Sequence, residues 1–535
     1  AAAEAALALY ADAEADRHWQ AALANRPTLA QQMQILGGRW RLLRQREDQP
    51  GLVAAVVTLD TLGHQARATP SAGQVAQDAA VNAAEILALT NRSAEAVQRL
   101  RACLADPALG VALRAQALRV LSQALSREGR TDEARQATEQ ALAAGGLTPL
   151  QQGGLLHALS YTCFLQGQPG DALRYARRAL VCWQSAGARR LVARAHASIG
   201  RALDMLDERE PAWAELERAY ELAAELKLVD LQREVANNLA NNRVNLGEPA
   251  RAIAVIREAW ALSPHFAMPA MPVFYLGILV QAHYQLGELG QALSLSDDAL
   301  ARAQALGEGM TLADCVTMTL PLHTLMGDQA GAARRQAALQ GLALHGLDYI
   351  RVKLAFSLVL QAVQQGDLAA ARAALQDVGD IQALQQPPDR AYARLRHAQV
   401  ALAAGQAEAA LQWLQPLHGA PLYAEARVLS AATRLAAHTA LGQVDAAANA
   451  AADALLLGAP AQPHLPALPA LPALPALQLL WQRRRAATLA GDTAGAALWQ
   501  RRLRAAWQAL HSSLATHPGA RAAFAALWGP RAAGG

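Results

Sequence analysis

The chain has 535 residues, of which 53% are hydrophobic, 17% charged and only 4% aromatic. So many apolar residues with so few aromatics make Ala and Leu the main constituents, which favours helices and excludes a mostly β protein or a disordered one. The net charge is only +4 and is spread along the chain, which argues against nucleic acid as a partner of this chain.

The sequence carries no membrane or export signal. Apolar runs are interrupted every few residues by Arg, Gln or Glu, so no stretch of 18 residues is able to span a bilayer. Cys103, Cys163, Cys182 and Cys315 show no CxxC spacing, which indicates a reducing compartment. We therefore expect a cytoplasmic protein that does not enter a membrane. Because the chain begins at Ala1 rather than Met, we expect a piece of a longer protein.

Residues 1–72 are predicted to form a helical entry or cap that contains a degenerate repeat. The evidence is two segments with a helix-forming sequence before the regular pattern begins, 5–23 (AALALYADAEADRHWQAAL) and 39–47 (RWRLLRQRE).

Residues 73–460 contain a repeat with steps of mostly 37–40 residues, which extends into 477–535. Its turns are marked by residues that tolerate a left-handed backbone, namely Asn91, Gly129, Gly167, Asp207, Gly247, Gly287, Gly327, Gly366, Gly405, Gly442 and Gly491. Five residues after each turn stands an alanine, namely Ala96, Ala134, Ala172, Ala212, Ala252, Ala292, Ala332, Ala371, Ala410, Ala447 and Ala496. A small residue there lets two helices cross closely. The pattern predicts an all-α solenoid of stacked antiparallel helical hairpins.

The last turn is delayed by a Pro-Ala-Leu tract, which we assign as a linker over 461–476. Pro466, Pro469, Pro472 and Pro475 recur every third residue, and this spacing disfavours a helix and favours an extended strut. We interpret the tract as a lengthened loop; the alternative is a ligand for an aromatic groove of a partner. Residues 477–535 are predicted to form the last repeat and the C-terminal capping helices.

Catalytic motifs are missing from the sequence. HExxH, paired CxxC, GxSxG and a strand-leading GxGxxG do not occur. We therefore predict no enzymatic activity, no catalytic residue, no metal ligand and no cofactor.

The repeat resembles the tetratricopeptide repeat, with a small residue at the turn and alanines at two fixed positions of the second helix. Because the usual period is about 34 residues, the longer period here is similar to the sensor arms of bacterial signal-transduction (STAND-type) ATPases, such as the maltose-regulon activator and its relatives. That resemblance implies a right-handed superhelix and an ATPase or regulatory domain fused at the N-terminus. The chain itself has no Walker A motif and no recognisable helix-turn-helix.

The tetratricopeptide resemblance also implies a concave groove lined by the first helix of each repeat. Carrying its positions across gives a predicted binding surface made of Tyr161, Phe164, Arg194, Arg201, Asp204, Glu234, Phe274, Gln281 and Tyr284.

The most unusual text is EVANNLANNRVN at 234–245. Asn237, Asn241 and Asn245 lie four apart on one helical stripe and Asn238 lies on the next, although Asn disfavours a helix. An Asn amide offers a donor and an acceptor together and pairs well with a peptide group. The NNLA at 237–240 is similar to that of kinesin light chains and peptide-sensing tetratricopeptide receptors, which implies a clamp on a peptide backbone. The alternatives are an Asn ladder between repeats and plain solvation.

Two kinds of segment combine arginine with tryptophan, RWRLLRQR at 39–46 and LWQRR at 480–484 and 498–502. Such segments stack on bases or grip acidic peptides. We favour the simpler interpretation of a solvated helix face whose arginine stems cover a tryptophan.

We therefore predict a non-enzymatic solenoid that binds a protein or peptide in its concave groove, as the ligand-sensing or partner-recognition arm of a larger bacterial transcriptional or signalling regulator. The alternative is a free-standing scaffold or assembly chaperone that bridges two proteins.

Overall fold

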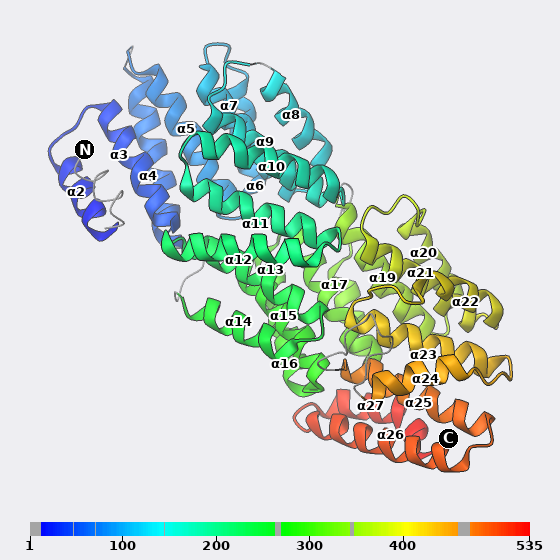
Figure 1. Ribbon diagram of the computed structural model, residues 1–535. Helices are drawn as coiled ribbons and strands as arrows, with labels where there is room; N and C mark the ends of the chain where they lie inside the picture. Colours follow the sequence, from blue (N-terminus) through cyan, green and yellow to red (C-terminus); the bar gives the residue numbers. More distant parts are fainter. Residues whose placement is uncertain are drawn as a thin grey trace. The chain divides into compact units, whose positions relative to one another are not determined.

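The computed structural model describes residues 12–45, 48–69, 71–143, 145–262, 269–342, 347–457 and 471–534. Within these ranges the regular structure consists of α-helices, α2 to α27, and one short 3-10 helix. The helices follow one another as antiparallel hairpins (Figure 1). The chain is therefore all-α and has the tetratricopeptide-like solenoid fold that the repeat predicted.

The chain divides into two compact units, and the division falls within helix α13. Unit 1 comprises Ala1–Asn238, Glu258–Pro272 and Ala343–Asp348. Its helices are α2 (Asp12–Ala24), α3 (Leu29–Gln45), α4 (Gln49–Arg67), α5 (Gly73–Leu89), α6 (Ser93–Leu104), α7 (Val111–Arg127), α8 (Thr131–Ala143), α9 (Pro149–Leu165), α10 (Pro169–Ser185), α11 (Arg189–Met205), α12 (Arg209–Glu225) and the first part of α13 (Val229–Asn245).

Unit 2 comprises Leu239–Arg257, Val273–Leu342 and Tyr349–Gly535. It holds most of α14 (Pro249–Ala261), α15 (Met271–Leu286), α16 (Leu289–Leu306), α17 (Gly309–Met326), α18 (Gln329–Ala338), α19 (Asp348–Gln365), α20 (Leu368–Val378), α21 (Pro387–Ala403), α22 (Ala407–Leu414), η1 (Gln415–Leu417), α23 (Ala424–Ala440), α24 (Ala446–Leu456), α25 (Ala473–Leu489), α26 (Thr493–Ser513) and α27 (Pro518–Ala533).

The predicted turn positions all adopt the left-handed backbone. The nine glycines have φ between 66° and 82°, and Asn91 and Asp207 have φ of 64° and 62°. This conformation ends the first helix of each hairpin and lets its last carbonyls accept hydrogen bonds from the turn. In the hairpin of α9 and α10, for example, the amide of Gln168 donates to the carbonyl of Cys163 at 2.8 Å.

Nine of the eleven predicted alanines are fully buried, with exposed fractions of 0–2%. The prediction is wrong for Ala447, which is exposed, because the loop after Gly442 is longer and α24 begins later. Asp445 caps that helix by accepting from the amide of Ala448, and Ala448 takes the buried position. Ala496 is half-buried against the core of unit 2.

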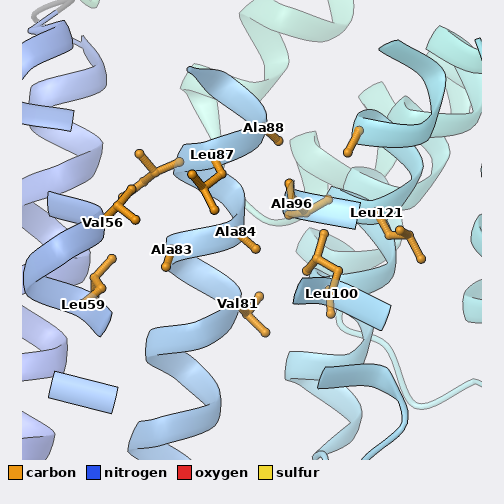
Figure 2. Packing of buried hydrophobic residues seen from close by; sticks show 14 of the residues in the cluster. Val56, Leu59, Val81, Ala83, Ala84, Leu87, Ala88, Ala96, Leu100 and Leu121 are labelled. Carbon is orange, nitrogen blue, oxygen red and sulfur yellow. The ribbon is translucent and has the colours of Figure 1, made fainter. Parts of the chain in front are cut away.

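The hairpins bury a continuous layer of small and branched side chains between consecutive helices. Figure 2 shows this layer in the first part of unit 1, where the side chains of α5 lie between those of α4 on one side and those of α6 and α7 on the other. Leu87 and Leu100 have no exposed surface, and Ala96 lies at the close crossing between their helices. A hairpin exposes this apolar face unless the next one covers it, so stacking is what stabilises the array.

The last helices of unit 2 pack against its earlier ones. The indole nitrogen of Trp528 in α27 donates to the carbonyl of Leu325 in α17 at 3.1 Å, and the amide of Leu289 in α16 donates to the hydroxyl of Ser513 in α26 at 3.2 Å. Phe524 is completely buried in the same core. The C-terminal helices therefore cover apolar surface that the repeats of unit 2 would otherwise expose.

The linker predicted for 461–476 lies mainly outside the described residues, as does the start of the entry segment at 1–11. Where the chain is described again, α25 begins at Ala473 and includes Pro475. The expectation that Pro475 disfavours a helix was wrong, because a proline in the first helical turn removes no intrahelical hydrogen bond. Within the described ranges, no helix is long and apolar enough to cross a membrane.

Candidate functional site

In unit 1 the first helix of each hairpin contributes to one inner face. The evidence is an ion pair between helices near the two ends of the unit in the sequence: Arg44 of α3 lies 3.8 Å from Asp230 of α13. Helices α5, α7, α9 and α11 stand between these two in the sequence. Helices α3 and α13 are far apart in the order of the repeats, so their side chains can meet only if the row of first helices is curved. The face that carries Arg44 and Asp230 is therefore the concave side of unit 1.

Seven charged side chains on this side form what we name the inner ion-pair cluster. Arg194 of α11 lies 3.1 Å from Asp230 and 3.4 Å from Glu234, and Arg201 lies 3.6 Å from Glu234. The members are Arg44, Glu85, Arg119, Arg194, Arg201, Asp230 and Glu234. Their side chains keep 10–31% of their surface exposed, so solvent reaches the cluster.

The electrostatics of the cluster favour its charged form. Burial alone would raise the pKa of Glu85, but the guanidinium of Arg119, 2.6 Å away, holds the pKa of this carboxyl below its ordinary value. Burial and the neighbouring Arg194 and Arg201 lower the pKa of His157 to about 3. His157 is therefore neutral at physiological pH, and its Nε2 lies 3.0 Å from the hydroxyl of Ser198.

Several residues of the predicted groove do come together here. The guanidinium carbon of Arg201 lies 4.5 Å from the ring centre of Phe164 and 5.7 Å from that of Tyr161, and these two rings stack 6.3 Å apart. With Arg194 and Glu234, five predicted residues thus share one surface. Asp204, on the same helix as Arg201, is half-buried. Most of this surface is already paired within the chain.

The asparagines of α13 continue the stripe on which Asp230 and Glu234 lie, at helical spacing. Asn237 and Asn238 are half-buried, and the amide oxygen of Asn237 and the amide nitrogen of Asn238 are buried without a hydrogen-bond partner. For these two atoms the alternative of an Asn ladder is therefore excluded. Asn241 and Asn245, further along the helix, are also half-buried.

The remaining predicted residues belong to unit 2. Phe274 and Gln281 of α15 are half-buried, whereas Tyr284 is only 4% exposed. The hydroxyl of Tyr284 donates to a carboxylate oxygen of Glu425 in α23 at 3.3 Å. This hydrogen bond again joins first helices that are far apart in the order, so these helices also face a common side within unit 2.

That side carries a second set of charged groups, which we name the unit 2 polar cluster. Its members are Tyr284, Asp314, Lys353, Asp389, Tyr392, Arg396 and Glu425. The ammonium of Lys353 bonds to the hydroxyl of Tyr349 at 3.1 Å. Asp314 and Asp389 form no hydrogen bond or ion pair within the described part of the chain, although Asp389 is only 5% exposed.

The carboxyl groups of this cluster are destabilised as anions. Burial raises the pKa of Asp314 to about 6 and outweighs the attraction of Lys353. Burial likewise raises the pKa of Asp389 and that of Glu425. Arg396 is 3% exposed and donates to Gln399 at 2.7 Å through one terminal nitrogen, but its Nε has no hydrogen-bond partner.

Sequence reasoning missed most of the unit 2 polar cluster. The available signals were Lys353, one of only two lysines, and Asp389 with Arg396 seven residues later on the same helical stripe. Neither signal shows that α17, α19, α21 and α23 bring these side chains together.

The fold has counterparts among solved structures. A Rap protein complexed with competence and sporulation factor matches with a TM-score of 0.51 at 14% identity, over 66% of this chain and 98% of that one. The apo form of RapI gives a TM-score of 0.40 at 14% identity over 65% and 96%. The Cut9–Hcn1 hetero-tetramer of the APC/C gives 0.43 at 13% identity over 98% and 95%. No protein-family model and no curated protein sequence matches the chain. The first comparison establishes similarity of fold to a tetratricopeptide-like repeat protein.

Proposed function

We propose that the chain is a non-enzymatic binding protein that holds an extended peptide or protein segment against the inner face of unit 1. The observation that carries the proposal is the pair of buried amide atoms on Asn237 and Asn238 that lack hydrogen-bond partners. A buried polar atom left unpaired costs about 1–3 kcal/mol. A peptide backbone supplies the missing donor and acceptor together.

The surroundings of these asparagines suit a polypeptide. Glu234 lies one turn before Asn238 on the same stripe and is paired with Arg194 and Arg201. The rings of Tyr161 and Phe164 lie beside Arg201 and offer apolar contact. Charged pairs, aromatic rings and amides on neighbouring first helices would give an extended ligand contacts over several repeats.

The fold comparison is consistent with this use of the surface. The Rap protein that the chain resembles in fold was solved in complex with competence and sporulation factor. We transfer from it only the expectation that a repeat array of this kind holds a partner.

The test is selection from an immobilised library of random heptapeptides on the full chain, followed by titration of the enriched peptide. We expect the double substitution Asn237→Ala and Asn238→Ala to weaken binding by about tenfold or more, because both amide contacts to the backbone are lost. Fluorescence anisotropy of the labelled peptide measures the dissociation constant.

Asn25→Ala is the matched control, since Asn25 is exposed just after the end of α2 and its side chain donates to the carbonyl of Ala21 on the same helix. Its affinity should equal that of the parent. The clamp is wrong if the double variant binds the enriched peptide as tightly as the parent and gains only stability.

The finer proposal concerns the biological role. We infer from the sequence resemblance that the chain is the ligand-sensing or partner-recognition arm of a larger cytoplasmic bacterial regulator of the STAND type. The test is the full-length coding sequence: an upstream ATPase or DNA-binding domain supports this role.

A free-standing scaffold or assembly chaperone is the second candidate. The observation in its favour is that the inner charges of unit 1 are already paired within the chain, which leaves little of that face for a sensed ligand. A coding sequence with Met directly before Ala1 and no further domain would support the scaffold and contradict the sensor.

A further inference from the structure

The C-terminal helices α25, α26 and α27 carry charge of almost one sign. Residues 471–534 contain eight arginines and a single acidic residue, Asp492, which gives a net charge of +7, whereas the whole chain has only +4. Asp492 is engaged at the start of α26, where its side chain accepts from the amide of Gly495. The segment therefore has very little negative charge of its own to offset its arginines, and the expectation that charge is spread along the chain is wrong for it.

Two of these arginines, Arg485 and Arg531, lie over the indole ring of Trp481. The guanidinium carbons of Arg485 and Arg531 lie 5.1 Å and 4.6 Å from the ring centre of Trp481. Neither forms an ion pair within the described residues. Burial and the charge of Arg485 lower the pKa of Arg531, as expected for like charges held together. An anion between these two guanidinium groups would relieve their repulsion.

A stripe of α26 extends this basic surface along α27. Gln500 donates to the carbonyl of Ala532, and His511 accepts from Nε of Arg521 at 3.2 Å, so both ends of the stripe face α27. Arg504 and Trp507 lie between them at helical spacing, and Arg504 is exposed. The stripe adds further cations to the surface.

Two indole donors on this surface are unpaired. The indole nitrogens of Trp481 and Trp507 are buried and have no hydrogen-bond partner. Two other indoles of the chain are paired: Trp40 donates to the side chain of Asn82 at 2.9 Å, and Trp528 to the carbonyl of Leu325 at 3.1 Å. The unpaired donor of Trp481 lies beside two cations that form no ion pair within the described residues, and this combination favours a ligand that is both an acceptor and an anion.

We propose that this arginine–tryptophan band, made of Trp481, Arg485, Arg504, Trp507, Arg521 and Arg531, binds a carboxylate-rich extended segment of a partner protein. Carboxylates accept from guanidinium and indole donors at once, and an extended chain follows the line of the three helices. The ring of Trp481 is covered by arginines, and Trp499 and Trp528 are 4% and 3% exposed, so an open platform for stacking bases is lacking at these rings. This favours a peptide over a nucleic acid. The arginines do cover the indole of Trp481, as the simpler interpretation expected, and the proposal adds a ligand to that face.

The test uses the full chain and a fluorescein-labelled polyglutamate of about ten residues, with binding followed by fluorescence anisotropy. We expect saturable binding that weakens as salt is added, and a loss of about tenfold or more in the double variant Arg485→Gln and Arg531→Gln. The single variant Trp481→Phe keeps the ring but removes the donor, and should weaken binding by about threefold to tenfold.

The matched control is Arg177→Gln with Arg178→Gln, which removes the same charge from exposed positions on α10. If this control weakens binding as much as the band variant, the probe reports net charge alone and the proposal is wrong. It is also wrong if an oligothymidylate of equal length binds more tightly than polyglutamate. Thermal melts of each variant establish that the fold is intact. The outcome is independent of the asparagine clamp, because the two surfaces share no residue.

Discussion

The inner sides of the two units both carry partly buried carboxyl groups, but these groups are paired with arginines in unit 1 and are not ion-paired in the described part of unit 2. In unit 1 the carboxylates lie in direct contact with arginines, as Glu85 does with Arg119 at 2.6 Å and Asp230 with Arg194 at 3.1 Å. In unit 2, Asp314 and Asp389 form no ion pair with Lys353 within the described residues. Burial outweighs the attraction of this lysine and raises the pKa of both carboxyl groups. Similar residue types on similar repeats therefore give a stabilising network in one unit and strained charges in the other.

The difference teaches where to look for function in such an array. A charge that is paired within the chain holds neighbouring first helices together, so unit 1 gains stability from its cluster. A buried charge without a partner lowers stability and is retained only if something else benefits from it. The same reasoning applies to the amides of Asn237 and Asn238 and to the indole donors of the arginine–tryptophan band.

The largest expected effect comes from breaking the network of unit 1. Arg194→Ala leaves Asp230 and Glu234 with only weaker, more distant partners, so we expect a loss of about 2–3 kcal/mol in the free energy of unfolding. Urea denaturation followed by circular dichroism measures it. Arg189→Ala on the same helix is the control, because its pair with Glu225 is 57% exposed on both sides and should cost less than about 1 kcal/mol. Equal losses would contradict the contrast.

A second comparison is between a regular hairpin, where the repeat alanine is buried, and the hairpin of α24, where the helix begins later and the repeat alanine is exposed. Ala134→Leu puts a larger side chain at a fully buried helix crossing and should cost about 1–3 kcal/mol. Ala447→Leu changes the same repeat position where the alanine is exposed, and should stay within about 0.5 kcal/mol. Thermal unfolding of both variants tests the register directly, and a large loss at Ala447 would contradict it.

The free energy of unfolding should depend on pH with opposite slopes for the carboxyl groups of the two clusters. Asp314 has a folded pKa of about 6, above its ordinary value, so the folded state binds a proton more tightly than the unfolded state. Its contribution to stability therefore falls as pH rises from about 4 to about 6, by about 2 kcal/mol after allowance for its partial exposure. Asp314→Asn should remove this slope in urea titrations between these pH values.

Glu85 should show the opposite slope, because its folded pKa lies below the ordinary value. Its stabilisation is present above the ordinary value and is lost as pH falls below it. If Glu85→Gln leaves the acid limb of the stability curve unchanged, the pairing with Arg119 contributes nothing measurable.

The smallest effect is expected for Asp389→Asn. Within the described residues this buried carboxylate has no hydrogen bond or ion pair to lose, and the attraction of Lys353 is outweighed by burial. Removing its charge should therefore change the unfolding free energy by less than about 1 kcal/mol, in the stabilising direction. Chemical denaturation at neutral pH measures it, with Glu85→Gln as the matched removal of a paired charge. A marked loss at Asp389 would show that this carboxylate is paired in solution.

Much of the candidate site was visible in the sequence as a set of positions. The repeat register placed Tyr161, Phe164, Arg194, Arg201 and Glu234 on one face, and the structure brings these five together. The register could not show that Arg44, 186 residues before Asp230 in the chain, reaches the same cluster, because that contact depends on how strongly the row of helices curves.

The sequence by itself determined the helical class, the hairpin period, the turn positions and most of the buried alanines. Each of these follows from local backbone preference and from the size of one side chain, which neighbouring residues largely decide. The tertiary structure alone decided which charges are paired, which donors remain unsatisfied and which surface the C-terminal helices cover. Those outcomes depend on small rotations summed over successive hairpins, and no single stretch of sequence encodes that sum.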